Sequence, residues 1–585
     1  DFAPKLAAHS AEISANKQLF ARIADLWAQR DALDLDGEQL RVLMLTHRGF
    51  LRGGAALEGD ADARMKEIKA RLAVLGTEFT QNLLADEREW FMPLEEADLE
   101  GLTDFVVGAA RAAGKEKGTD GPVVTLSRSL IVPFLQFSPR RDLREKAFAA
   151  WTARGANGGE TDNREIAAET LALREERAKL LGYENFSAFK LETEMAKTPE
   201  AVRKLLMDVW ERAKAQANAD AEVLTKMMHA DGINGDLEAW DWRYYAEKRR
   251  KAEHDLDEAA LKPYLQLDRM IEASFACANR LFGLEFAPLN VPLYHEDCRA
   301  WDVTRNGKHI AVFIGDYFAR GSKRSGAWCS AMRSQAKFPD TQTPVVINVC
   351  NFAKSDPALL SYDDARTLFH EFGHALHFLA SNVEYPSQNG GVRDYTEFQS
   401  QLLERWLTTD EVIDKYLTHH ETGKPIPKSL VAKIKKAATF NEGFKTTEYL
   451  ASAIIDLKLH TTDPSNIDPD KFERETLTAM NMPEEIVMRH RTPQFGHVFS
   501  GEGYSAGYYG YMWAEVLTAD AAEAFMEAPG GFYDKEVGDR LVKYLFAVRN
   551  AMDPAEAYRK FRGRDAKVDA LMRDRGFPIP KESKE

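Results

Sequence analysis

Apolar residues recur every three or four positions along most of this chain, which is the spacing produced by one buried face of an α-helix. The pattern is almost unbroken from Phe2 to about Arg111 and resumes at Pro139. We therefore predict a mostly α-helical fold, with an N-terminal helical lobe over residues 1–138 and a larger domain over residues 139–582.

The spacing changes between Tyr294 and Asn351, where short runs rich in β-branched residues predict strands. Residues 301–304 and 309–314 flank an Asn306-Gly307 pair, which predicts a hairpin, and residues 344–350 predict a third strand. An exposed edge of this small sheet could hold an extended peptide by strand addition, although a purely structural ribbon fits the pattern equally well.

The helix after these strands carries a His-Glu-x-x-His motif at His370, Glu371 and His374. At about 100° per residue the two histidines share one polar face. The opposite face carries an apolar stripe of Ala365, Leu368, Phe369, Phe372, Leu376 and Leu379. Two imidazoles one turn apart can bind one zinc ion, and Glu371 can reach a water at the open position of the metal. The alternative is an ordinary surface helix with histidines on its solvated face.

The motif leaves the third protein ligand open. Position 380 is alanine, so the third histidine of the metzincin pattern is missing. His377 shares the face of His370 but lies about 10 Å further along the axis, so we interpret it as supporting the site from outside the ligand set. The candidate carboxylates are Glu384, Asp394, Glu397 and Glu404. Spacing does not choose among them, and Asp394-x-x-Glu397 also fits a capping box that starts a helix predicted from Tyr395 to Leu407.

Composition and charge narrow the class of protein. The 585 residues are 44% hydrophobic and carry 77 basic and 92 acidic side chains, a net charge of 77 − 92 = −15, without a basic block. This balance disfavours nucleic acid and anionic membranes as partners, and no apolar run is long enough to span a bilayer. The four cysteines lack Cys-x-x-Cys spacing, so we interpret them as free thiols. We expect a soluble monomer.

The N-terminal residues bear on the cellular compartment in which the protein is expected. No signal peptide is visible, which favours the cytoplasm. The sequence starts at Asp1 without methionine, however, so the periplasm is the alternative if a signal peptide has been removed.

Several segments far apart in the chain resemble one family. Residues 369–374 contain the zinc motif and residues 393–401 follow it as Arg-Asp-Tyr-Thr-Glu-Phe-Gln-Ser-Gln. Further matches are residues 195–201, 240–247, 326–328, 348–351, His497 and residues 503–513. Together they resemble the thimet oligopeptidase family of zinc metallopeptidases, and specifically its bacterial peptidyl-dipeptidase (dipeptidyl carboxypeptidase) branch. The resemblance spans most of the chain from about residue 139.

This resemblance implies that Glu397 is the third ligand of a single zinc ion. It also implies a mostly helical ellipsoid with a deep channel, and short peptides as substrates. This chain differs from the family pattern in two places. The family usually carries a further helical segment ahead of Asp1, so we expect a truncated or processed form, and the glycine-rich loop at residues 499–504 holds one extra residue and a charge at Glu502.

The chemistry of these residues suits peptide hydrolysis. Zinc lowers the pKa of its bound water towards about 7, so Glu371 can act as the general base. We predict His497, Tyr504 and Tyr511 as catalytic donors to the oxyanion, and Tyr508 as a substrate contact, although a tyrosine run also packs well in a core. Arg393 is the predicted partner of the substrate carboxylate, against the alternative of a surface arginine.

Three alternative functions remain open. An oligopeptidase that cleaves peptides internally would use the same zinc residues. A serine hydrolase is suggested by Gly503-x-Ser505-x-Gly507, but this nucleophile elbow needs a preceding buried strand that the sequence does not predict. A non-catalytic peptide-binding protein would have no need of the base Glu371.

Overall fold

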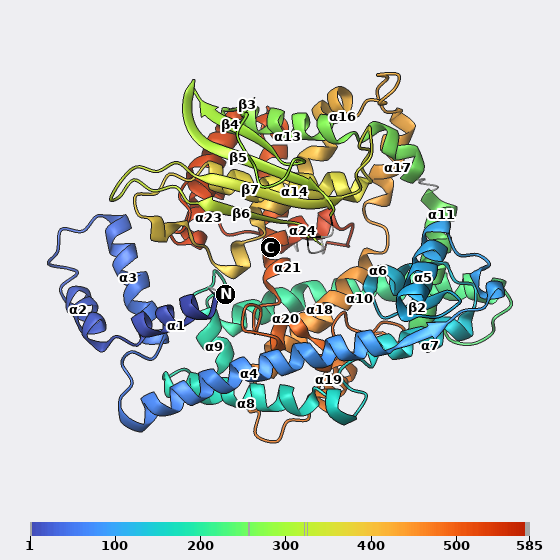
Figure 1. Ribbon diagram of the computed structural model, residues 1–585, viewed down its shortest axis with the longest axis horizontal. Helices are drawn as coiled ribbons and strands as arrows, with labels where there is room; N and C mark the ends of the chain where they lie inside the picture. The colour runs from blue at the N-terminus through green and yellow to red at the C-terminus, as the bar shows by residue number, and fades with distance from the viewer. Residues whose placement is uncertain (1–2, 255–257, 321, 324–325, 580–585) are drawn as a thin grey trace, which may run out of the picture. The chain divides into compact units, whose positions relative to one another are not determined.

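The computed structural model describes residues 3–254, 258–320, 322–323 and 326–579, and most of them are helical (Figure 1). The predicted mostly α fold with a small sheet is confirmed. The chain divides into two compact units: unit 1 comprises residues 1–56, 256–435 and 510–574, and unit 2 comprises residues 57–255, 436–509 and 575–585. No helix within the described ranges is both long and apolar enough to cross a membrane.

Unit 1 contains a five-stranded sheet with the strand order β3-β4-β5-β7-β6. The strands are β3 (Leu284–Pro288), β4 (Arg299–Arg305), β5 (Lys308–Phe318), β6 (Trp328–Arg333) and β7 (Val345–Phe352). β4 and β5 form the predicted hairpin, in which Asn306 and Gly307 adopt φ of 52° and 71°, values that asparagine and glycine tolerate best. β7 runs parallel to β5, and β6 pairs with β7 as an antiparallel edge strand. The sequence analysis did not identify β3 or β6 as strands.

Helix α14 (Tyr362–Leu379) carries the His-Glu-x-x-His motif beside this sheet. It begins at a capping box, in which the Ser361 hydroxyl accepts from the backbone of Asp364 and the Asp364 carboxylate accepts from the backbone of Ser361. The predicted apolar stripe is buried. Phe372 lies in an aromatic cluster, with ring centroids 5.5 Å from Phe275 and 5.4 Å from Phe313. The apolar back of the helix therefore anchors it and leaves the histidine face open.

The helix predicted over residues 395–407 is broken into three pieces: the 3₁₀ turn η5 (Arg393–Tyr395), α15 (Phe398–Glu404) and the 3₁₀ turn η6 (Arg405–Thr408). α15 packs against α14 on one side and against α21 (Gly510–Met526) on another. Gly373 makes the α14–α15 contact possible, because a Cβ there would lie 2.5 Å from the carbonyl oxygen of Gln399 and 2.7 Å from the Cα of Ser400.

The other helices of unit 1 are α1 (Ala3–Ser14), α2 (Lys17–Ala28), α3 (Gly37–Arg52), α12 (Glu258–Leu261), α13 (Leu267–Phe282), α16 (Asp410–Tyr416), α22 (Lys535–Leu541), α23 (Pro554–Arg562) and α24 (Val568–Asp574). α17 (Lys428–Ala437) crosses the division between the units. The π-helical segment η9 (Val542–Phe546) leads into a turn that contains Arg549.

Unit 2 is built on long helices, α4 (Gly59–Glu89), α8 (Arg164–Leu180), α10 (Pro199–Ala230) and α18 (Glu442–Leu459), with α4 against α8 and α10 against α18. Its other helices are α5 (Asp104–Lys117), α6 (Arg128–Phe137), α7 (Arg141–Thr152), α9 (Phe186–Leu191), α11 (Ala239–His254), α19 (Pro469–Ala479) and α20 (Gly496–Phe499). A two-stranded sheet of β1 (Phe91–Pro93) and β2 (Val123–Thr125) interrupts the stretch predicted as wholly helical.

We predict that Gly373→Ala destabilises the protein by about 1–3 kcal/mol, because the added methyl overpacks the α14–α15 contact. Thermal denaturation followed by circular dichroism measures the change. The control is Gly49→Ala in α3, where a Cβ meets nothing within 4 Å and helix propensity predicts a gain of about 0.5–1 kcal/mol. Equal melting temperatures for Gly373→Ala and the unmodified protein would contradict the close approach.

Candidate metal centre

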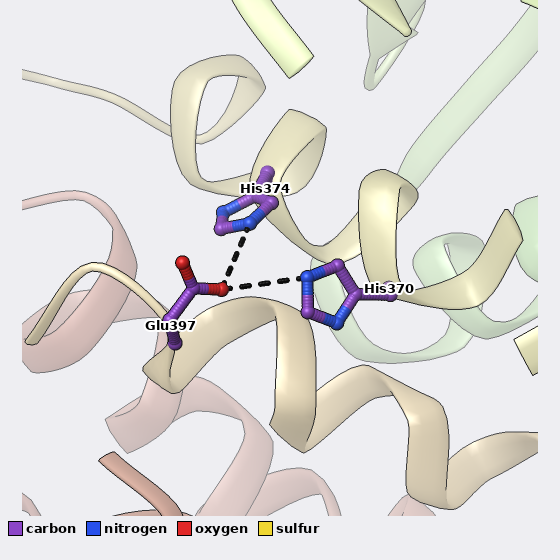
Figure 2. A group of neighbouring side chains, drawn as sticks. All are labelled: His370, His374 and Glu397. Carbon is purple, nitrogen blue, oxygen red and sulfur yellow. Dashed lines mark ion pairs between the residues drawn. The ribbon is translucent and has the colours of Figure 1, made fainter. Parts of the chain in front are cut away.

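The two motif histidines both approach one carboxylate oxygen of Glu397, the residue just before α15. The Nε2 atoms of His370 and His374 each lie 3.4 Å from the same oxygen of Glu397. Figure 2 shows the carboxylate reaching toward both imidazoles from the adjoining segment. Glu397 lies just ahead of α15 and makes no capping hydrogen bond, so its side chain serves the histidines rather than the helix start.

This arrangement fits a tetrahedral metal ion. Zinc bonds of about 2.0–2.1 Å to nitrogen and oxygen place neighbouring ligand atoms about 3.3 Å apart. Two imidazoles and a carboxylate are also a donor set that zinc accepts. His370, His374 and Glu397 form a possible metal-binding group among the described residues, whereas Glu384, Asp394 and Glu404 do not join them.

Glu404 instead holds His370 from its other side. The Glu404 carboxylate lies 2.6 Å from Nδ1 of His370, and its second oxygen lies 3.0 Å from Nε of Arg366. A carboxylate on the far ring nitrogen fixes the tautomer that leaves Nε2 free for a metal. The sequence analysis listed Glu404 only as a possible ligand, since spacing did not reveal which nitrogen it meets.

The acidic neighbours also set the charge state of the ligands. Burial lowers the pKa of His370, but hydrogen bonds with Glu397 and Glu404 outweigh it and raise that pKa to about 10. Burial raises the pKa of Glu397. Its hydrogen bonds with the imidazoles of His370 and His374 outweigh burial and hold that pKa well below its usual range. A metal ion at Nε2 of His370 therefore competes with a proton for that nitrogen.

Glu371 faces a cavity of about 430 Å³ that the metal-binding group also lines. It is only 5% exposed, and its Oε2 makes no hydrogen bond with any described residue. Burial raises the pKa of Glu371, and the nearby imidazoles of His370 and His374 offset part of that rise. A buried carboxylate with a free oxygen beside a metal-binding group has the properties of a general base.

His377 lines the same cavity one turn beyond His374. Its Nε2 lies 3.4 Å from Nε2 of Gln399 on α15. Burial lowers the pKa of His377, and the positive charge of Arg549 lowers it further. His377 is therefore neutral at physiological pH and does not belong to the metal-binding group.

Three predicted site residues, two donors and one substrate contact, lie together in unit 2. The ring of His497, on α20, lies 5.3 Å from that of Tyr504 and 5.4 Å from that of Tyr508, measured between centroids. Asp456 holds the loop by accepting from the backbone N–H groups of Ala506 and Tyr508 at 2.9 and 3.0 Å. Burial raises the pKa of Tyr508 to about 12, so its phenol keeps its proton at neutral pH.

Positive charge surrounds His497. His497 lines a cavity of about 720 Å³ in unit 2 together with Arg128, Arg489 and His490. Burial lowers the pKa of His497, and Arg489 and Arg128 lower it further, so its imidazole is neutral. The sequence analysis missed these basic neighbours because no motif marks them.

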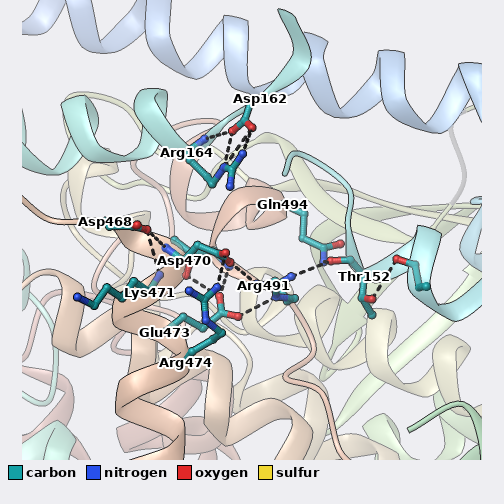
Figure 3. Close-up of polar contacts among 12 residues, drawn as sticks. Thr152, Asp162, Arg164, Asp468, Asp470, Lys471, Glu473, Arg474, Arg491 and Gln494 are labelled. Carbon is teal, nitrogen blue, oxygen red and sulfur yellow. Dashed lines mark hydrogen bonds and ion pairs between the residues drawn. The ribbon is translucent and has the colours of Figure 1, made fainter. Parts of the chain in front are cut away.

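A polar network holds the segment that precedes His497 (Figure 3). Arg491 donates to Glu473 at 2.8 Å and also contacts Asp470, both on α19. Glu473 in turn accepts from the backbone N–H of Thr492 at 2.7 Å. These partly buried, charge-assisted bonds hold the backbone from which α20 begins.

The charge in the glycine-rich loop is neutralised. Glu502 forms an ion pair with Arg177 at 2.7 Å, and its backbone carbonyl accepts from Lys190 at 2.7 Å. The Ser505 hydroxyl is buried and donates to the same carbonyl of Glu502 at 3.0 Å. The short helix α20, and no strand, leads into this loop, so the strand-turn-helix context of a nucleophile elbow is missing here.

The remaining predicted residues lie in unit 1. Tyr511 is on α21, which packs against η5. Arg393 is exposed on η5, and the lining of the metal-site cavity includes its neighbour Val392 but not Arg393 itself. Arg549, which the sequence analysis did not identify, does line that cavity.

Comparison with known proteins assigns the family. The family model described as Peptidase family M3 matches residues 134–577. The chain belongs to peptidase family M3. It is a metallopeptidase, and the resemblance stated from the sequence motifs is confirmed.

Curated relatives match this M3 chain over nearly its whole length. The dipeptidyl carboxypeptidase of Escherichia coli (strain K12) is 35% identical, with 99% of this chain and 86% of that protein covered. Oligopeptidase A of the same strain is 31% identical, with 98% and 86% covered. Among solved structures, PZ peptidase A with inhibitor 2 has a TM-score of 0.55 at 13% identity, with 98% of this chain and 87% of that chain covered, which shows a shared fold.

We predict that Glu404→Gln weakens zinc binding roughly 10- to 100-fold while keeping one site per chain, because only the group that orients His370 changes. Competition with a chromogenic chelator measures the affinity. The matched comparison is Glu397→Gln, which removes a predicted ligand and should weaken binding further. Unchanged affinity in Glu404→Gln would show that His370 needs no carboxylate partner.

Proposed function

We propose that this chain is a zinc-dependent peptidase that releases dipeptides from the C-terminus of short peptides. The observation that carries the proposal is that Nε2 of His370 and Nε2 of His374 each lie 3.4 Å from one oxygen of Glu397, beside the buried base Glu371. The relatives named dipeptidyl carboxypeptidase support the exopeptidase mode. One zinc ion, a monomeric state and a cytoplasmic location stay predictions.

The metal-binding group and Glu371 have separate roles in the proposed hydrolysis. A bound zinc ion would act as a Lewis acid and lower the pKa of its water towards about 7. Glu371 takes the proton of the attacking water and passes it to the leaving amine. Its raised pKa makes it a stronger base than an exposed glutamate, and its Oε2 has no competing hydrogen bond among the described residues.

The edge strand β6 offers a place for the peptide backbone. Within the part of the chain that the structure describes, β6 pairs only with β7, and its residues Trp328 and Cys329 line the same cavity as Glu371. An extended peptide can add to such an edge through main-chain hydrogen bonds, which tolerate any side chain. Trp328 is 50% exposed and offers an apolar surface to one substrate side chain.

We propose His497, Tyr504 and Tyr511 as donors to the oxyanion, with Tyr508 and Arg393 as substrate contacts. The grouping of the His497, Tyr504 and Tyr508 rings supports a common role for these three. Neutral imidazole and phenol groups can donate hydrogen bonds to a developing negative charge.

An oligopeptidase is the second candidate, because relatives named Oligopeptidase A are 30–31% identical to this chain over 98% of its length. The metal centre and Glu371 serve both modes of cleavage equally. The two candidates differ only in whether the site requires the terminal carboxylate of the peptide.

We predict that Glu371→Gln keeps its zinc and loses roughly 10²–10⁴-fold in kcat, because only the proton transfer is removed. Steady-state cleavage of a short peptide, together with metal analysis of the same preparation, measures both quantities. The matched control is Ser505→Ala, which should stay within a few-fold of the unmodified enzyme. Loss of activity in Ser505→Ala with full activity in Glu371→Gln would support the serine hydrolase instead.

We also predict that a nonapeptide with a free C-terminus is shortened by two residues at a time. Mass spectrometry of the products at early times should find C-terminal dipeptides and peptides of seven and then five residues. A chelator should abolish all products, and re-addition of zinc should restore them. Internal fragments at the earliest times would favour the oligopeptidase.

A further inference from the structure

Arg549 is a buried cation in the cavity of the metal centre. Its exposed fraction is 9%, and its guanidinium carbon lies 4.5 Å from the ring centroid of Phe378 on α14. Nη2 donates to the backbone carbonyl of Asn389. Nε and Nη1 are buried and make no hydrogen bond with any described residue.

No carboxylate within the described ranges forms an ion pair with Arg549. The groups that would raise its pKa are the Cys329 thiol and the Tyr395 phenol, and burial keeps both of them neutral at physiological pH. A buried charge without a counter-charge is costly, and proteins normally pair it or replace it with an apolar residue. The carbonyl contact and Phe378 hold one side of the guanidinium. Nε and Nη1 lie on different edges of the guanidinium, and either can donate one hydrogen bond to an anion such as a carboxylate.

The contact with Phe378 on α14 gives an approximate distance between Arg549 and the metal centre along the helix axis. The midpoint of His370 and His374 lies about 9 Å along the helix axis from Phe378, at about 1.5 Å per residue. An extended peptide advances about 3.5 Å per residue, so two residues and a hydrogen bond of about 3 Å together span about 10 Å. One residue with its hydrogen bond would reach only about 6.5 Å.

We propose that the guanidinium of Arg549 binds the C-terminal carboxylate of the peptide substrate and so sets the length of the released fragment at two residues. This inference rests on the proposed exopeptidase function and names the residue that enforces it. Arg393, the candidate from sequence, is exposed and does not line this cavity, so it is the rival candidate for this carboxylate.

The test compares one nonapeptide with its C-terminal amide. The unmodified enzyme should cleave the free acid with a kcat/KM roughly 10- to 150-fold above that of the amide, as expected for a charge-assisted hydrogen bond. Arg549→Gln should lose most of this preference by slowing only the free acid. Arg549→Lys should keep part of it, because the charge remains. The control is Arg64→Ala, at an exposed arginine of α4 in unit 2, which should keep all of it.

The results of this test distinguish a failure of the proposed exopeptidase function from a failure of the proposed role of Arg549. Equal rates on acid and amide by the unmodified enzyme would overturn the exopeptidase function and this inference together. A full preference retained in Arg549→Gln, or an equal loss on both substrates, would overturn the role of Arg549 alone. If Arg549→Gln does not fold, a crystal structure of the unmodified enzyme with a dipeptide product decides: we expect the carboxylate on Arg549, and a carboxylate bound to another cation refutes the inference.

Discussion

The metal centre depends on how closely the backbone of α15 approaches that of α14. Gly373 lies between the motif residues and has no Cβ to hold the second helix away. This approach lets one short segment contact His370 on both sides of its ring, with Glu397 at Nε2 and Glu404 at Nδ1. Seven residues, or two turns, separate these carboxylates, so a single rigid element supplies both a ligand and the group that orients another ligand.

The second constraint on this site is that charged side chains are buried with some of their hydrogen-bonding atoms unused. Glu371 and Arg549 line one cavity, and each has side-chain atoms without a hydrogen bond among the described residues. Such groups lower stability on their own, and they persist where a ligand completes them. In the proposed function, a peptide with a free C-terminus would supply both residues: a bond to be hydrolysed near Glu371 and an anion about two residues further along for Arg549.

The sequence was sufficient for the features that depend on local periodicity. It predicted the helical fold, the hairpin at Asn306 and Gly307, and the face of α14 that holds His370 and His374. It could not choose between Glu397 and Glu404 from spacing alone, because the predicted continuous helix is broken by 3₁₀ turns whose start depends on packing. Arg549 lies in a turn with no motif, and only its burial against Phe378 distinguishes it from a surface arginine.

The most direct test of this account is X-ray absorption at the zinc edge of the purified enzyme. The account predicts one zinc per chain with four nitrogen or oxygen ligands at about 2.0–2.1 Å, and scattering from two imidazole rings. Glu397→Gln should change this first shell, whereas Glu404→Gln should preserve the number of ligands. A sulfur ligand at about 2.3 Å, or a shell without two imidazoles, would contradict a centre built from His370, His374 and Glu397.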